Sequence, residues 1–193
     1  MFVGNSMTLH GIAPKIGWLG EWGMAASAKS RDYVHILMDR IGKVSPDAAF
    51  CICQVSQWEK NYKEGTKMHS QYENARDFKA DLIIMRFVEN CPRDDFDGQV
   101  FHRELDALLH YLDKTGNAKI LLTTGFWRHP ADRDILAYAM EQQLPCILLG
   151  DLGDQDDMKA LGLFEHDGVA RHPGDLGMQH MADRIFAEVK ALL

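Results

Sequence analysis

A serine, a histidine, a carboxylate and an asparagine lie in separate segments of the chain, and together they could carry out nucleophilic catalysis. A serine hydroxyl attacks well only when a neighbouring base takes its proton, and that base needs a group that orients it. Ser6 is the candidate nucleophile, His172 the candidate base and Asp167 the candidate orienting group. The amide of Asn90 could donate a hydrogen bond to the oxyanion that such an attack creates.

Three of these residues also have ordinary structural interpretations. Ser6 could cap a helix that follows it, Asn90 could form a turn, and His172 could be a loop residue without a role. Each structural interpretation is the simpler one for a single residue. All three lie where strands of one sheet are expected to end or just before the last helix, and this joint placement favours catalysis.

The orienting group has several candidates. Asp167 lies five residues before His172, but His166 or Asp175 could also contact the imidazole. Asp175 is more simply explained as the N-cap of the helix that follows it. A dyad of serine and histidine without a carboxylate is a further alternative.

The elements that would position these residues follow from the pattern of apolar runs. Short, nearly continuous apolar runs are typical of strands buried on both faces, and apolar residues three or four apart are typical of helices. Strands alternating with helices predict parallel pairing through right-handed crossovers. We therefore expect one three-layer α/β/α domain over residues 1–193, with a central, mostly parallel sheet of about five strands. The expected strands are 2–3, 48–55, 81–88, 119–126 and 145–150, and the expected helices include 30–43, 101–116 and 175–193.

The expected active site lies at the carboxyl ends of these strands. In open α/β sheets, ligands bind in the crevice beyond those ends. The segments there carry Ser6, Asn90 and the tryptophans Trp22 and Trp127, and the segment before the last helix carries His172. We expect Trp22 and Trp127 either to pack in the fold or to form an apolar wall or a flat platform for substrate.

The blocks around these residues resemble those of the SGNH hydrolase superfamily, the GDSL-like esterases and lipases. The first block is "GNSMTLHG", with Asn5 where the family usually has aspartate. The third is "RFVENC", which keeps Asn90 but has Val88 for glycine and Cys91 for aspartate. The last, "DGVARHPGDLGMQHMADRI", has two more residues than usual between its aspartate and its histidine. In "GWLGEWGMAAS", Gly23 is the best candidate for the family's second block.

The resemblance implies a flavodoxin-like fold and a serine esterase. Ser6, His172 and Asp167 would form the triad, and the N–H groups of Ser6 and Gly23 with the amide of Asn90 would form the oxyanion hole. The reaction would need no cofactor and no metal, and the substrate would be a small ester, which we expect to be a short acyl group on a carbohydrate. The alternative is a non-catalytic binding or interaction domain that kept the scaffold.

Composition limits the other classes of function. The formal net charge of −7 and the absence of a basic stripe argue against a nucleic-acid partner. No apolar run approaches the roughly 20 residues that cross a bilayer, and no signal segment is recognisable, so a cytoplasmic location is the default expectation. The sequence assigns no oligomeric state.

Overall fold

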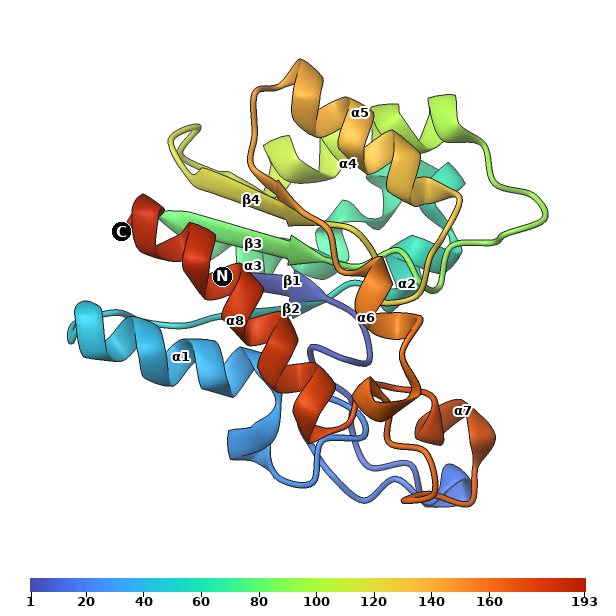
Figure 1. Ribbon diagram of the computed structural model, residues 1–193. Helices are drawn as coiled ribbons and strands as arrows, with labels where there is room; N and C mark the ends of the chain where they lie inside the picture. The colour runs from blue at the N-terminus through green and yellow to red at the C-terminus, as the bar shows by residue number, and fades with distance from the viewer.

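The computed structural model describes residues 1–193 and contains a five-stranded sheet between two layers of helices (Figure 1). All neighbouring strands are parallel, and their order is β2-β1-β3-β4-β5. The expected three-layer α/β/α architecture is confirmed. The strands are β1 (Phe2–Gly4), β2 (Ile52–Gln54), β3 (Leu82–Arg86), β4 (Lys119–Thr123) and β5 (Cys146–Ile147).

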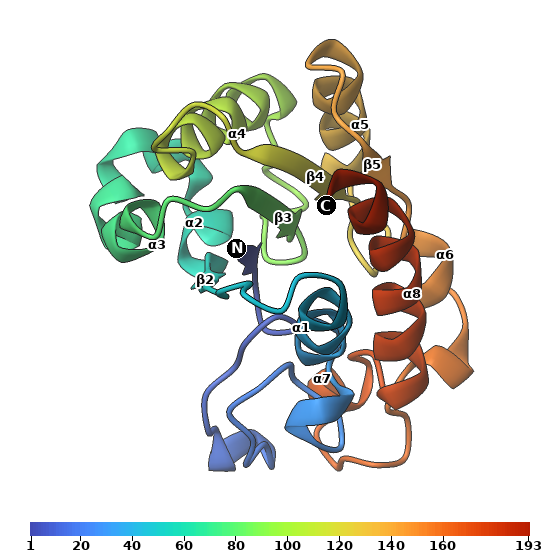
Figure 2. The ribbon, with the colours of Figure 1, turned by 90° about the vertical axis from the view of Figure 1, so that its left-hand side faces the viewer.

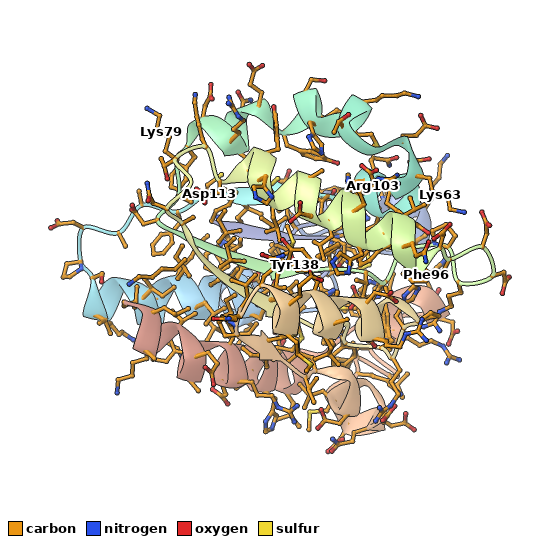
Figure 3. The ribbon with its side chains drawn as sticks, turned by 90° about the horizontal axis from the view of Figure 1, so that it is seen from above. Lys63, Lys79, Phe96, Arg103, Asp113 and Tyr138 are labelled. Atoms are coloured by element: carbon orange, nitrogen blue, oxygen red, sulfur yellow. The ribbon has the colours of Figure 1, made fainter.

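Helices cover both faces of the sheet (Figures 1 and 2). One face carries α2 (Ser56–Lys60), α3 (Glu73–Asp77), α4 (Gly98–Leu112) and α5 (Ala131–Glu141), and Figure 3 looks down on α4 and α5 lying side by side. The other face carries α1 (Tyr33–Val44) packed against α8 (Asp175–Leu192). The remaining short elements are α6 (Gly150–Gly153), α7 (Asp167–Ala170) and the 3-10 segments Pro14–Ile16, Lys29–Arg31, Tyr62–Tyr72 and Asp156–Met158.

Each face of the sheet has its own apolar core because successive side chains of a strand point to opposite faces. Val3 and Met85 pack with residues of α2 to α5, whereas Phe2 and Ile84 pack with residues of α1 and α8. Trp58 is fully buried in the first of these cores. This explains why the strands contain continuous rather than alternating apolar residues.

Two helix boundaries differ from expectation. The expected helix 30–43 is α1, which begins only at Tyr33, after Asp32, whose carboxylate accepts the N–H of His35, and which ends at Val44. Asp175 is the first residue of α8 and does not cap it. Its carboxylate accepts two hydrogen bonds from Ser27, which tie the loop before α1 to the start of α8.

The strand order reverses direction between β1 and β3. The chain passes from β1 to β2 on one side and returns to β3 on the other, and such a reversal leaves the carboxyl ends of the two strands open to a ligand. In Figure 1 the strand arrows point toward the side of the molecule on which α6 and α7 lie. No helix has the length and hydropathy needed to span a membrane.

Candidate functional site

Ser6 lies in a tight turn directly after β1. Gly4 must be glycine here, because a side chain at this position would overlap Thr8 Oγ1 and the carbonyl of Arg86. The chain then turns back, with the N–H groups of Thr8 and Leu9 both donating to the carbonyl of Asn5 at 2.9 and 3.0 Å. No helix starts at this turn, so the interpretation of Ser6 as a helix cap is wrong.

The Ser6 hydroxyl meets the imidazole of His172. Ser6 Oγ lies 2.9 Å from His172 Nε2, and the other ring nitrogen, Nδ1, lies 2.7 Å from the carbonyl oxygen of Gly168 in α7. A carbonyl oxygen only accepts hydrogen bonds, so the neutral imidazole carries its hydrogen on Nδ1. Nε2 is therefore the acceptor for the Ser6 hydroxyl, which is the arrangement that a general base requires.

Asp167 does not orient His172, contrary to expectation. Its carboxylate accepts a 2.7 Å hydrogen bond from Arg171 Nε, and its side chain is 73% exposed. Asp175 binds Ser27, as described above, and His166 forms no hydrogen bond with His172. The helical turn of α7 brings the Gly168 carbonyl to the imidazole at the place where a carboxylate was expected.

Burial lowers the pKa of His172 from 6.5 to about 4. The bond to the Gly168 carbonyl and the negative charge of Glu89 oppose this shift, and the charge of Arg86 adds to it. Because no carboxylate contacts the ring, these opposing effects are too weak to compensate for the loss of water around an imidazolium. His172 is therefore neutral at pH 7 and able to accept a proton.

The two tryptophans differ in their relation to this pair. The ring of Trp127 stands perpendicular to that of His172, with ring centroids 5.0 Å apart, so this half-buried side chain borders the site. Trp22 packs edge-on against Trp18, and its indole N–H donates to the carbonyl of Ala26 at 2.9 Å. Trp22 forms no hydrogen bond with Ser6 or His172, and its ring does not pair with the imidazole.

The expected oxyanion donors are only partly available. The backbone N–H of Ser6 donates to no protein group. The N–H of Gly23, however, donates to Asp32 Oδ2 at 2.9 Å, so it is not free to bind an oxyanion in this structure. Gly23 is glycine for a packing reason, since a Cβ there would overlap the carbonyl of Met7.

Asn90 is held by a glutamate that the sequence argument did not single out. Its Nδ2 donates to Glu59 Oε2 at 2.7 Å, and its backbone N–H approaches Glu59 Oε1 at 3.4 Å. An amide nitrogen carries two hydrogens, and Nδ2 of Asn90 makes only this one hydrogen bond within the protein. The half-buried Asn90 thus keeps one donor for a ligand.

Glu59 belongs to a buried polar cluster beneath the turn of Ser6. Asn5 Nδ2 donates to both Glu59 Oε1 at 3.0 Å and Glu89 Oε2 at 2.6 Å. Arg86 pairs with Glu89 and donates to Asn5 Oδ1 at 3.0 Å. The sequence did contain one signal for this cluster, because Arg86 interrupts the apolar run of a strand that is buried on both faces.

The two carboxylates of this cluster have opposite pKa shifts. Burial, and then the charge of Glu89, raise the pKa of Glu59, against the hydrogen bonds that Asn5, Asn90 and Val88 donate to it. Burial alone would raise the pKa of Glu89, but Arg86 and several hydrogen bonds lower it overall. Glu89 with Arg86 is therefore the ion pair of the cluster.

Comparisons with known proteins agree with the fold. The structure is similar to that of the psychrotrophic esterase EstA from Pseudoalteromonas sp., inhibited by monoethylphosphonate, with a TM-score of 0.61 and 11% identity over 99% of this chain and 97% of that chain. It is also similar to the two-domain esterase CEX, active on acetylated mannans and co-crystallized with mannopentaose, with a TM-score of 0.59 and 15% identity. That match covers 99% of this chain and 49% of CEX. No protein-family model and no curated protein matches the sequence.

These similarities define the class of fold. The chain forms an α/β/α fold with the parallel strand order β2-β1-β3-β4-β5, and this fold is similar to those of the two esterases. The fold resemblance stated from the sequence is confirmed. At identities of 11% and 15% the similarity is one of fold, so the reaction has to be inferred from the site.

Proposed function

We propose that the protein is a serine esterase in which Ser6 is the nucleophile and His172 the general base. The observation that supports this proposal most directly is a pair of hydrogen bonds to the His172 imidazole. Ser6 Oγ lies 2.9 Å from Nε2, and the Gly168 carbonyl oxygen lies 2.7 Å from Nδ1. A serine hydroxyl without a catalytic role needs no neutral imidazole held in one tautomer. The similarity of fold to esterases supports the same reaction class.

The reaction would proceed through an acyl-enzyme. Ser6 Oγ attacks the ester carbonyl carbon while its proton passes to His172 Nε2, and the carbonyl oxygen becomes an oxyanion. When the tetrahedral intermediate collapses, the bond to the alkoxy oxygen breaks and His172 gives its proton to the leaving alcohol. Water then attacks the acyl-enzyme with His172 again as base, which releases the carboxylic acid and restores Ser6.

The oxyanion hole would consist of two donors. The free N–H of Ser6 and the remaining N–H of the Asn90 amide are the groups available to it. Gly23 is left out, because its N–H is used by Asp32. Removing one donor from such a hole typically costs about 10²- to 10³-fold in kcat, so a hole of two donors depends strongly on Asn90.

A short acyl group on a carbohydrate is the substrate that we propose. None of the five main hollows of the surface is lined by Ser6 or His172, and this favours a short acyl group over a long one. Trp127 lies beside the imidazole and is the aromatic side chain against which the sugar would pack. The similarity to CEX, which is active on acetylated mannans, supports this substrate class.

The competing function is that of a non-catalytic binding domain on the same scaffold. Two observations favour it: the N–H of Gly23 is occupied, and no carboxylate supports His172. The two functions differ in one measurable property, because only an esterase would form a covalent bond at Ser6 with an activated phosphonate.

The experiment combines labelling with hydrolysis. Purified protein is incubated with a serine-directed phosphonate, the modified peptide is identified by mass spectrometry, and hydrolysis of acetyl to octanoyl esters is measured. We expect one adduct, on Ser6, and rates that fall with acyl length. Ser6→Ala should abolish both signals, and Ser56→Ala, which changes another half-buried serine after a strand, should keep both. Neither adduct nor hydrolysis in the wild-type protein would refute the esterase and favour the binding domain.

A further inference from the structure

We propose that Glu59 is a positioning residue of this site and that its carboxylate fixes the amide of Asn90 in the orientation that leaves a donor for the oxyanion. The inference rests on the proposed esterase function and adds a residue that the family blocks do not contain. It is argued from the hydrogen bonds around Glu59, its burial and the backbone conformation of Val88.

Glu59 is fully buried in α2, at the carboxyl end of β2. All of its hydrogen bonds come from donors. Oε1 accepts from Val88 N at 2.6 Å, from Asn5 Nδ2 at 3.0 Å and, at 3.4 Å, from Asn90 N. Oε2 accepts from Asn90 Nδ2 at 2.7 Å. The side chain of Glu59, which follows β2, therefore binds two other segments. It holds the segment after β1 through Asn5 and the segment after β3 through Val88 and Asn90.

An acceptor-only partner determines which way the Asn90 amide faces. The two ends of an asparagine amide have nearly the same shape, so the hydrogen-bond network decides whether oxygen or nitrogen points to a given group. A carboxylate accepts only, so Asn90 must present Nδ2 to Glu59, and one hydrogen of Nδ2 remains unused. A partner that both donates and accepts would allow either orientation, and half of the molecules could then present oxygen where the oxyanion forms.

The backbone of the same segment also depends on Glu59. Val88 has a φ of 116°, in the region that favours glycine, and a β-branched residue there is strained. Its N–H makes the 2.6 Å bond to Glu59, and its side chain is fully buried. The glutamate thus stabilises the unusual turn that carries the chain from β3 to Asn90.

The first test is kinetic. Glu59→Gln keeps the shape of the side chain but replaces one acceptor by a donor, so we expect kcat to fall by about tenfold or more while KM changes by less than about threefold. Glu104→Gln is the matched control, because Glu104 is also a buried glutamate, bonded by Arg103 in α4 at 2.7 Å. It should leave kcat unchanged. Thermal unfolding of each variant reports whether the fold is retained.

A double-mutant cycle separates positioning from general stabilisation. We expect Asn90→Ala alone to lower kcat by about 10²- to 10³-fold, as loss of one oxyanion donor does. If Glu59 acts through Asn90, then Glu59→Gln should lower kcat no more than about twofold further in the Asn90→Ala background. Equal and additive losses in both backgrounds would overturn the inference, as would an unchanged kcat in Glu59→Gln alone.

A measurement that needs no activity distinguishes failure of this inference from failure of the proposed function. In the wild-type protein, the side-chain amide of Asn90 should give one pair of NMR signals with slow hydrogen exchange, because Nδ2 is anchored to Glu59. Glu59→Gln should accelerate that exchange or split the signals, and Glu104→Gln should not. An inactive wild-type protein with an anchored Asn90 would refute the esterase alone, whereas an Asn90 signal unaffected by Glu59→Gln would refute the positioning role.

Discussion

The esterase activity that we propose should be lost in acid only near pH 4, far below the range in which an ordinary histidine becomes protonated. Neutral His172 can accept the Ser6 proton and the imidazolium cannot, so kcat/KM is lost as the pH falls through the pKa of His172 in the free enzyme. Burial lowers that pKa from 6.5 to about 4, and the partner of Nδ1 is an uncharged carbonyl.

The size of the effect follows from the two pKa values. At about pH 5.5, a histidine with a pKa of about 4 is roughly nine-tenths or more neutral, whereas one with a pKa of about 6.5 is only about one-tenth neutral. The wild-type protein should therefore keep nearly all of its kcat/KM at that pH. The assay measures acetate released from an uncharged acetyl ester across the range from about pH 4 to 8, so that ionisation of the substrate does not contribute.

A midpoint of the acid limb near pH 6.5 or above would refute this reasoning. It would mean that a carboxylate supports the imidazolium during catalysis, and Asp167 would be the first candidate to have moved to it. Asp167→Asn measured across the same pH range is therefore the companion variant, and we expect its acid limb to coincide with that of the wild-type protein.

The same pKa has a consequence for folding stability. The folded state binds a proton at His172 less readily than the unfolded state, so unfolding takes up a proton between about pH 6.5 and pH 4, and stability falls as the pH decreases through that window. The shift corresponds to a loss of up to about 3 kcal/mol from this residue. The difference between the free energies of unfolding of the wild-type protein and His172→Gln, measured at both ends of the window, should show it. A constant difference would contradict the lowered pKa.

Three further substitutions test other parts of the site. Asp167→Asn should keep kcat within about threefold of the wild-type value, and a loss near the ~10⁴-fold seen when a true orienting aspartate is changed would restore the triad. Val88→Gly should be more stable to denaturant than Val88→Ala, because only glycine adopts the φ of 116° freely. A Val88→Gly variant that is less stable than Val88→Ala by about 0.5–1 kcal/mol, as is usual for glycine, would contradict this account. Asn5→Asp should lower the free energy of unfolding by roughly 2–4 kcal/mol, since it puts a third carboxylate against Glu59 and Glu89, and an unchanged unfolding curve would refute that.

Much of the fold could be predicted because the pattern of apolar residues reflects which side chains are buried. Burial in turn is set by the packing of the helix layers on the two faces of the sheet. All five strands lie within or next to the predicted runs, and the helices 30–43, 101–116 and 175–193 correspond to α1, α4 and α8. The helices between β2 and β3 were not named, since their segments are short and partly 3-10. Apolar periodicity is weak over single turns.

The site could be predicted where a residue's place next to a strand or helix is enough to bring it there. Ser6 and His172 are brought together as expected. The roles of Asp167 and Gly23 depend instead on competing partners, Arg171 for the first and Asp32 for the second, and spacing in the sequence gives no information about which partner prevails. Glu59 was missed for the same reason, because its importance comes from two other segments that converge on it, one through Asn5 and one through Val88 and Asn90.

The departures from the family pattern at Asn5 and Cys91 are explained together by the buried charges beneath the site. Asn5 donates to both Glu59 and Glu89, and an aspartate could not. Cys91 is buried, and the charges of Glu59 and Glu89 contribute to its raised pKa, after burial itself, so an aspartate at that position would add a charge of the same sign nearby. With Arg86 as the cation of the cluster, two buried carboxylates are already more than it can neutralise. Uncharged side chains at both positions are therefore what this cluster requires, and restoring either aspartate alone should weaken the fold.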